Sequence, residues 1–151
     1  MEVKKVLCAV DLEDTIAPSV EYAKMMASMT GASILVAYVI PAHTPYEDVY
    51  LSVNNQPNEV NNPNETIQKS MNALLAEQFA GMDATGVILV GRPSEELVKL
   101  AEEKGASLIV MGTHGRAGFD RLLFGSVAHE VVRAAPCPVM TVRPPCRRSK
   151  R

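Results

Sequence analysis

Apolar residues in this chain form short continuous runs that alternate with longer segments in which they recur every three or four positions. Continuous runs such as 3–10 and 33–40 are typical of buried strands, and the spacing of Ile16, Val20 and Ala23 is typical of an amphipathic helix. The pattern predicts five strands and four helices in strict alternation. The expected strands are 3–10, 33–40, 85–90, 107–111 and 138–142, and the expected helices are 15–30, 63–80, 93–104 and 126–135.

Glycine and proline punctuate these segments at the positions where helices and strands usually end. Gly31 and Gly105 directly follow helical segments, where a glycine commonly caps a helix. Pro63 and Pro93 stand at first helical positions, which tolerate the missing N–H. We expect Pro41 to end the second strand and Pro41 to Asn62, rich in Pro and Asn, to form a long loop.

Strands that are apolar throughout and alternate with amphipathic helices predict a parallel sheet with helices on both faces. Right-handed crossovers make this a doubly wound, Rossmann-like α/β fold with a five-stranded parallel sheet. Ligands of such folds bind beyond the carboxyl ends of the strands, where the strand order reverses. We expect residues 1–143 to form a single domain and residues 144–151 to form a basic, disordered tail.

Charge is distributed unevenly along the 151 residues, which are 47% hydrophobic and 21% charged. The formal net charge is −2, but Arg143 to Arg151 holds five basic and no acidic residues, so the remainder carries −7. An acidic body argues against a broad nucleic-acid-binding surface. We expect the basic tail to be a solvated end of the chain. Contact with nucleic acid or anionic lipid is the alternative.

Targeting and cysteine patterns favour the cytoplasm. Residues 1–5 do not show the pattern of a secretory signal, and no run approaches the ~20 apolar residues that span a bilayer. Cys8, Cys137 and Cys146 are far apart and form no C-x-x-C, so neither a disulfide framework nor a zinc site is expected.

A glycine-rich stretch carries the clearest functional signal. Gly112-Thr-His-Gly115 is followed by nine residues and then by Gly125-Ser126, between an expected strand and an expected helix. Free N–H groups and the helix dipole at such a turn attract phosphate, and glycine leaves room for a close approach. The stretch therefore predicts a nucleotide-binding site, with an empty turn and an N-cap serine as the alternative.

The chain resembles the universal stress protein family over nearly its whole length. The first strand ends Cys8-Ala-Val-Asp11 and leads into a helix. The stretch 105–116 leads into the glycine loop, and Pro136-Cys-Pro-Val-Met-Thr-Val142 is similar to the closing strand of the family. In this family the G-x-x-G-x9-G-[ST] pattern marks the branch that binds ATP. The chain departs from the family at Ser107, where an acidic residue is frequent, and we expect little effect on binding.

The resemblance implies a role for each residue of the site. The three glycines leave room for phosphates and Ser126 donates its hydroxyl and N–H, while Ala9 and Val10 line the purine pocket. The backbone of Val39 reads the adenine edge, and Asp11 bonds the ribose or helps to hold a metal, unless it caps the next helix. The expected binding residues are Ala9, Val10, Asp11, Val39, Met111, Gly112, His114, Gly115, Arg116, Gly125, Ser126 and Val127.

For the remaining candidate side chains, a structural or solvent-exposed position is the alternative to a role in binding. We interpret His114 as a loop residue near the phosphates or ribose, because no nucleophile with a matched acid stands near it. Arg116 either donates to a phosphate or is a solvent-exposed arginine. We expect His129 to be structural and Cys8 to be an inert residue of a buried strand.

These features predict a cytoplasmic protein that binds ATP as a regulatory or conformational ligand, with the use of Mg²⁺ left open. The loop after Pro41 would order over the ligand, and 139–142, as an edge strand, would pair two copies into a homodimer. A slow ATP hydrolase or nucleotidyl-transfer enzyme is the alternative, although the chain has no Walker A lysine. A dinucleotide-dependent oxidoreductase is disfavoured because residues 11–15 lack G-x-G-x-x-G.

Overall fold

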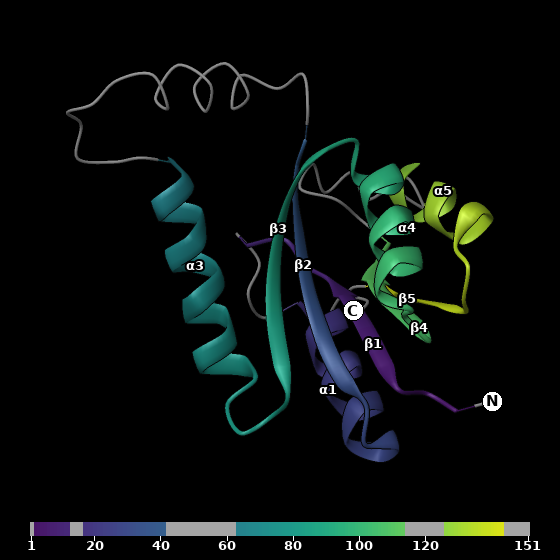
Figure 1. The fold of residues 1–151 in the computed structure, drawn as a ribbon, viewed down its shortest axis with the longest axis horizontal. Helices are drawn as coiled ribbons and strands as arrows, with labels where there is room; N and C mark the ends of the chain where they lie inside the picture. Colours follow the sequence, from purple (N-terminus) through teal and green to yellow (C-terminus); the bar gives the residue numbers. More distant parts are fainter. Residues whose placement is uncertain (1, 13–16, 42–62, 114–125, 144–151) are drawn as a thin grey trace, which may run out of the picture.

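A five-stranded, fully parallel sheet forms the centre of the molecule (Figure 1). The computed structural model describes residues 2–12, 17–41, 63–113 and 126–143. The strand order is β3-β2-β1-β4-β5, which is a doubly wound arrangement and confirms the expected fold class. The elements in chain order are β1 (Lys5–Ala9), α1 (Pro18–Thr30), β2 (Ser33–Pro41), α3 (Pro63–Gln78), β3 (Ala84–Gly91), α4 (Pro93–Lys104), β4 (Leu108–Gly112), α5 (Ser126–Ala134) and β5 (Val139–Val142).

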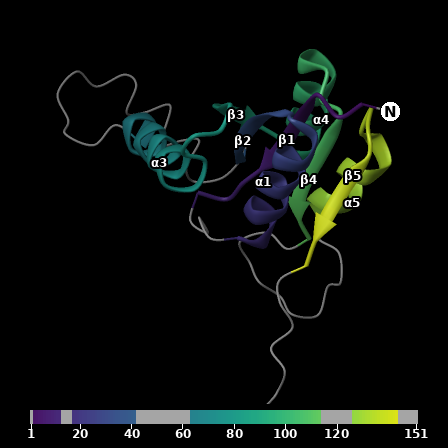
Figure 2. The same cartoon turned by 90° about the horizontal axis from the view of Figure 1, so that it is seen from below.

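Helices cover both faces of the sheet, so that two apolar layers form. Alternate side chains of a strand point to opposite faces, and in β1 Cys8 packs with α1 and α3 whereas Leu7 packs with α4 and α5. In Figure 2 the sheet runs from β3, beside α3, to β5 at the opposite edge. Burial of both faces explains why the strands are apolar throughout rather than alternating.

Two helices end where glycine was expected to cap them. Gly31 has φ 73° and its N–H donates to the Ala27 carbonyl at 2.8 Å. Gly105 has φ 65° and closes α4 in the same left-handed conformation. A residue with a Cβ is strained in this region, so glycine is favoured at both positions.

The expected starting point of α1 was wrong. The helix begins at Pro18 rather than near residue 15, and Ala17 is its N-cap, with φ −58° and ψ 140°. A residue that precedes proline is held away from helical backbone angles, and proline suits the first helical position. The other elements agree with expectation within about two residues; β2 includes Pro41 instead of ending before it. The loop expected at 42–62 lies outside the described residues.

Candidate functional site

The carboxyl ends of β1 and β4 mark the point at which the strand order of the sheet reverses. β2 and β3 lie on one side of β1, and β4 and β5 lie on the other. Pairing between β1 and β4 ends at Cys8 and Val110, while β4 stays paired with β5 to its last residue, Gly112. We call this place the switch point. The helix after β1 covers one face of the sheet and the helix after β4 covers the other, and doubly wound sheets bind ligands at such a place.

Val39 lies past the last residue of β2 that is paired with β1. That pairing ends at Ala9 and Ala37, whereas β2 stays paired with β3 to its own last residue. The Val10 N–H donates to the Ala37 carbonyl at 2.9 Å, so the peptide groups of Ala37 face β1. Because backbone groups alternate sides along a strand, the N–H and C=O of Val39 face the same way, beyond the end of β1. Its side chain is buried in the apolar layer beneath α4 and α5.

The backbone of Gly112 faces the switch point from the other side. The Ile109 N–H donates to the Pro138 carbonyl at 3.0 Å, and the Thr113 N–H donates to the Val142 carbonyl at 3.1 Å. These two odd-numbered residues of the β4 segment therefore face β5. Gly112, between them in the alternation, presents its peptide groups toward β1, past the last paired residue of that strand.

The residues that end β1 divide between the two faces of the sheet. Ala9 packs against the layer beneath α4 and α5, and Val10 packs against the layer beneath α1 and α3. Asp11 follows and is half-buried. It is not the N-cap residue of α1, because Ala17, six residues later, occupies that position. The alternative in which Asp11 is the N-cap of the following helix is therefore wrong.

Ser126 and Val127 open α5 on the far side of the glycine-rich stretch. Ser126 is exposed, and Val127 is half-buried against the layer beneath α4 and α5. Met111, in β4, is buried in that same layer. The remaining members of the expected site lie outside the described residues: His114, Gly115, Arg116 and Gly125.

Cys8 and His129 occupy separate surroundings. Burial raises the pKa of the Cys8 thiol to about 12, so the thiol is protonated and unreactive at neutral pH. His129 is exposed on α5. Among the residues that the structure describes, no three His, Cys, Asp or Glu side chains gather as metal ligands. Nor does any helix in this part of the chain have the length and apolar character to cross a membrane.

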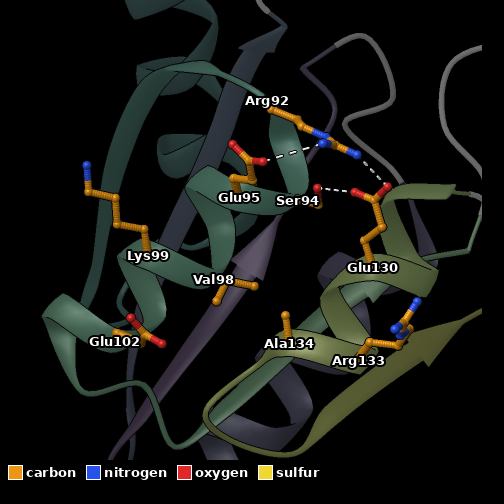
Figure 3. A pocket seen from close by; sticks show the side chains of 9 residues that line it. All are labelled: Arg92, Ser94, Glu95, Val98, Lys99, Glu102, Glu130, Arg133 and Ala134. Atoms are coloured by element: carbon orange, nitrogen blue, oxygen red, sulfur yellow. Dashed lines mark hydrogen bonds and ion pairs between the residues drawn. The ribbon is translucent and has the colours of Figure 1, made fainter.

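A second polar feature lies in a pocket of about 570 Å³ between α4 and α5 (Figure 3). Arg92, which precedes α4, donates from Nη2 to Oε1 of Glu130 on α5 at 2.7 Å, and the Ser94 hydroxyl donates to Oε2 of the same carboxylate. We call these three residues the interhelix cluster. The Ser94 hydrogen bond and the Arg92 guanidinium hold the pKa of Glu130 below its ordinary value.

The interhelix cluster was missed at the level of sequence. Glu130 stands 36 positions from Ser94 and 38 positions from Arg92, so no spacing rule connects them. The one local signal is the pair of Arg92 and Glu95, three residues apart at the start of α4, which form an exposed ion pair at 3.4 Å. That pair does not predict a bond to α5.

Comparison with known proteins places this arrangement in a family. A model of the universal stress protein family matches residues 2–143. The chain belongs to the universal stress protein family. The match covers all the strands and helices described above, so the switch point and the interhelix cluster both lie within the family domain.

Individual universal stress proteins are similar over most of the chain. Universal stress protein MJ0577 of Methanocaldococcus jannaschii is 28% identical over 153 residues, which cover 93% of this chain and 94% of the relative. The solved structure of MJ0577 superposes with a TM-score of 0.80, with coverage of 97% and 99% and 26% identity.

Two further solved structures share the fold and carry nucleotides. A universal stress protein in complex with cAMP has a TM-score of 0.68 at 23% identity, and the match covers 95% of this chain and 98% of that structure's chain. The universal stress protein from Archaeoglobus fulgidus in complex with dAMP has a TM-score of 0.58 at 24% identity, with coverage of 93% and 98%. Both therefore support the fold of this chain.

Proposed function

We propose that this universal stress protein binds ATP at the switch point and uses it as a regulatory ligand. The observation that carries the proposal is the open backbone on both sides of β1. Peptide groups of Val39 and Gly112 face the end of that strand, beyond its last paired residues. Gly112 also opens the G-x-x-G-x9-G-[ST] pattern that ends at Ser126. Polar backbone that a ladder leaves unpaired is suited to bind a polar ligand.

The base would lie on the β2 side. The N–H and C=O of Val39 form an adjacent donor and acceptor, which match the acceptor and donor on the edge of adenine. Ala9 and Val10 would contact the face of the purine. The side chain of Val39 stays in the core, so this reading assigns base recognition to the backbone alone.

The ribose and the phosphates would follow toward α5. Asp11 would bond a ribose hydroxyl or help to hold Mg²⁺ near the phosphates, since a carboxylate accepts hydrogen bonds and binds hard cations. Ser126 would donate its hydroxyl and N–H, where the dipole of α5 adds partial positive charge. We also propose that four residues of the glycine-rich stretch lie near the phosphates: Gly115, Gly125, His114 and Arg116.

Estimated interaction energies are compatible with micromolar binding. A hydrogen bond to a charged acceptor contributes about 1.5–3 kcal/mol net, so four of them give roughly 6–12 kcal/mol. A micromolar Kd corresponds to about 8 kcal/mol, after association costs of about 4–15 kcal/mol. Burial of the purine would have to supply the difference. The complexes of two related folds with cAMP and dAMP add support for an adenine nucleotide as the ligand.

The test is calorimetric titration of the nucleotide-free protein with ATP and Mg²⁺. We expect a Kd in the micromolar range, as estimated above. Gly115→Val should abolish binding, because its side chain would fill the space left for the phosphates. Ser126→Ala should weaken binding about tenfold, whereas Ser70→Ala, a serine-to-alanine change on α3, should not. No heat at millimolar ATP would contradict the proposal, and phosphate release faster than about one turnover per minute would favour a hydrolase.

We also propose a homodimer that forms through β5. This strand lies at the edge of the sheet, where unpaired backbone groups invite a second copy. Carbonyls of Pro138 and Val142 accept from β4, so the peptide groups of Thr141 face outward. Thr141→Pro removes one outward N–H and should yield a monomer by light scattering. Val132→Thr, an exposed change on α5, should remain dimeric, and a dimeric Thr141→Pro protein would count against this interface.

A further inference from the structure

We infer that the interhelix cluster is a positioning device that sets the separation between the base-binding and phosphate-binding sides of the switch point. The inference rests on the proposed nucleotide function and adds three residues to it. Arg92 lies between β3 and α4, Ser94 lies in the first turn of α4, and Glu130 belongs to α5. The cluster therefore joins the element that carries Val39, through the sheet, to the element that carries Ser126.

The β2 side of this connection is continuously paired sheet. β3 is paired with β2 along the whole of its length, up to Pro41 and Gly91, and Arg92 is the next residue. Gly91 has φ 153°, and a Cβ there would lie 2.8 Å from Cγ of Glu96, so α4 packs closely on this turn. Arg92 is consequently held in a fixed relation to the backbone of Val39.

The α5 side reaches Ser126 through one turn of helix. Glu130 lies four residues after Ser126, and an α-helix has 3.6 residues per turn, so the carboxylate stands on the same side of α5 one turn further on. Its two oxygens accept from different residues, Oε1 from Arg92 and Oε2 from Ser94. Two bonds to one carboxylate restrict the rotation and the sliding of α5 against α4 more than a single bond would. Figure 3 shows Glu130 reaching across to both donors.

A single ligand that touches both sides is sensitive to this separation, whereas a fragment that touches one side is not. Adenosine would contact the β2 side, and inorganic triphosphate would contact the amino end of α5. ATP gains from both only if the two sides are already spaced to receive it, because a linked ligand benefits from preorganisation. Loosening the cluster should therefore weaken the binding of ATP and leave the affinities for adenosine and inorganic triphosphate unchanged. A residue that only stabilised the fold would not separate these three affinities.

The experiment titrates wild type, Glu130→Gln and Ser94→Ala with ATP, adenosine and inorganic triphosphate. We expect the Kd for ATP to rise about tenfold in each variant, with the fragment affinities changed by less than about twofold. Glu95→Gln is the matched control, because it removes the other carboxylate partner of Arg92 without touching α5. Circular dichroism of each protein at the titration temperature establishes that it is folded. Arg92→Lys, which keeps the positive charge but loses the planar guanidinium, is a third variant of the cluster.

Each outcome decides between the proposals. Failure of the wild type to bind ATP overturns the proposed function, and the inference with it. If wild type and the folded cluster variants bind ATP equally well, the inference alone is overturned. The same holds if the variants lose affinity for ATP and for both fragments to the same extent. An equal loss of ATP affinity in Glu95→Gln would likewise contradict it, because the effect would then follow the charge of the pocket rather than the bonds to Glu130 on α5.

Discussion

The backbone of Val39 and the backbone of Gly112 face the same end of β1 from opposite sides. Val39 lies in β2 beyond the last residue paired with β1, and Gly112 lies in β4 beyond the last paired residue on that side. The hydrogen bonds of their strand neighbours fix both directions. This relation is a consequence of strand length, because β2 and β4 extend past β1 while β1 ends early. Among the described residues, it leaves the peptide groups of Val39 and Gly112 outside the pairing with β1.

A base contact made by the backbone of Val39 predicts that truncating its side chain leaves affinity intact. Val39 is 8% exposed, so Val39→Ala should lower the free energy of unfolding by about 2 kcal/mol through lost burial and the cavity left behind. The Kd for ATP should change by less than about twofold. Val36→Ala, in the same strand but in the opposite apolar layer, is the control and should behave alike. Chemical denaturation and calorimetry measure the two quantities. A Kd raised about tenfold by Val39→Ala alone would show that the side chain contacts the base.

Asp11 is predicted to act on the ligand and not on α1. Since Ala17 is the N-cap of that helix, Asp11→Ala should not incur the cost of about 1 kcal/mol typical of a lost cap. The ligand role is tested by Asp11→Asn. It should weaken binding of ATP with Mg²⁺ about tenfold, because an amide is a poorer acceptor and a poorer cation ligand than a carboxylate. Asp83→Asn, at an exposed position before β3, is the matched control. Titration with and without Mg²⁺ separates the two roles. If Asp11→Asn raises the Kd for ATP by the same factor in both conditions, Asp11 contacts the ribose and not the metal. A loss of about 1 kcal/mol in the free energy of unfolding of Asp11→Ala would contradict this interpretation.

The interhelix cluster predicts a pH dependence with a defined sign. The Ser94 hydrogen bond, aided by Arg92 and His129, lowers the pKa of Glu130 from its ordinary value of 4.5. A carboxyl whose pKa is lower in the folded state stabilises the fold above its unfolded pKa, and that contribution is lost as the pH falls through the folded pKa. Wild type should therefore be more stable than Glu130→Gln at neutral pH, and the difference should vanish in acid. Thermal unfolding across the acid range measures it, and a difference that grows as the pH falls would contradict the sign.

Cys8 is predicted to be inert until the protein unfolds. Burial holds its pKa at about 12, so the thiolate is scarce at the pH of about 8.5 at which exposed thiols ionise. Because the pKa of Cys8 is higher in the folded protein than in the unfolded chain, the buried protonated thiol favours the folded state. This contribution to the free energy of unfolding is fully present below pH 9 and declines as the pH rises toward 12. Cys137, which is half-buried, serves as the internal control. Alkylation followed by peptide mapping should label Cys137 in the native protein and Cys8 only in denaturant; rapid native labelling of Cys8 would overturn the prediction.

Local chemistry explains why so much of the fold could be predicted. Pro93 and Gly105 bound α4 because proline suits the first helical position and glycine suits the left-handed cap, and neither depends on the rest of the molecule. The same kind of rule, applied to Pro18, would have placed the start of α1 correctly. The doubly wound class followed from the alternation of apolar strands with helices.

Features that depend on contacts distant in sequence could not be predicted in this way. The ends of β1 pairing, which expose the backbone of Val39 and Gly112, are set by the packing of neighbouring strands and leave no residue pattern. The bonds of Glu130 to Arg92 and Ser94 join elements across β4 in the chain. The roles of Asp11 and Ser126 came from a family resemblance rather than from local chemistry, and they stay predictions.

The most direct measurement of the central claim is a titration of the isotopically labelled protein with ATP and Mg²⁺, followed by the backbone amide resonances. If ATP binds at the switch point, the largest shifts should occur at the amides of Val10, Val39, Gly112 and Ser126, and the amides of α3 should stay unchanged. Changes confined to the pocket between α4 and α5, or no change at millimolar ATP, would contradict a nucleotide site at the end of β1.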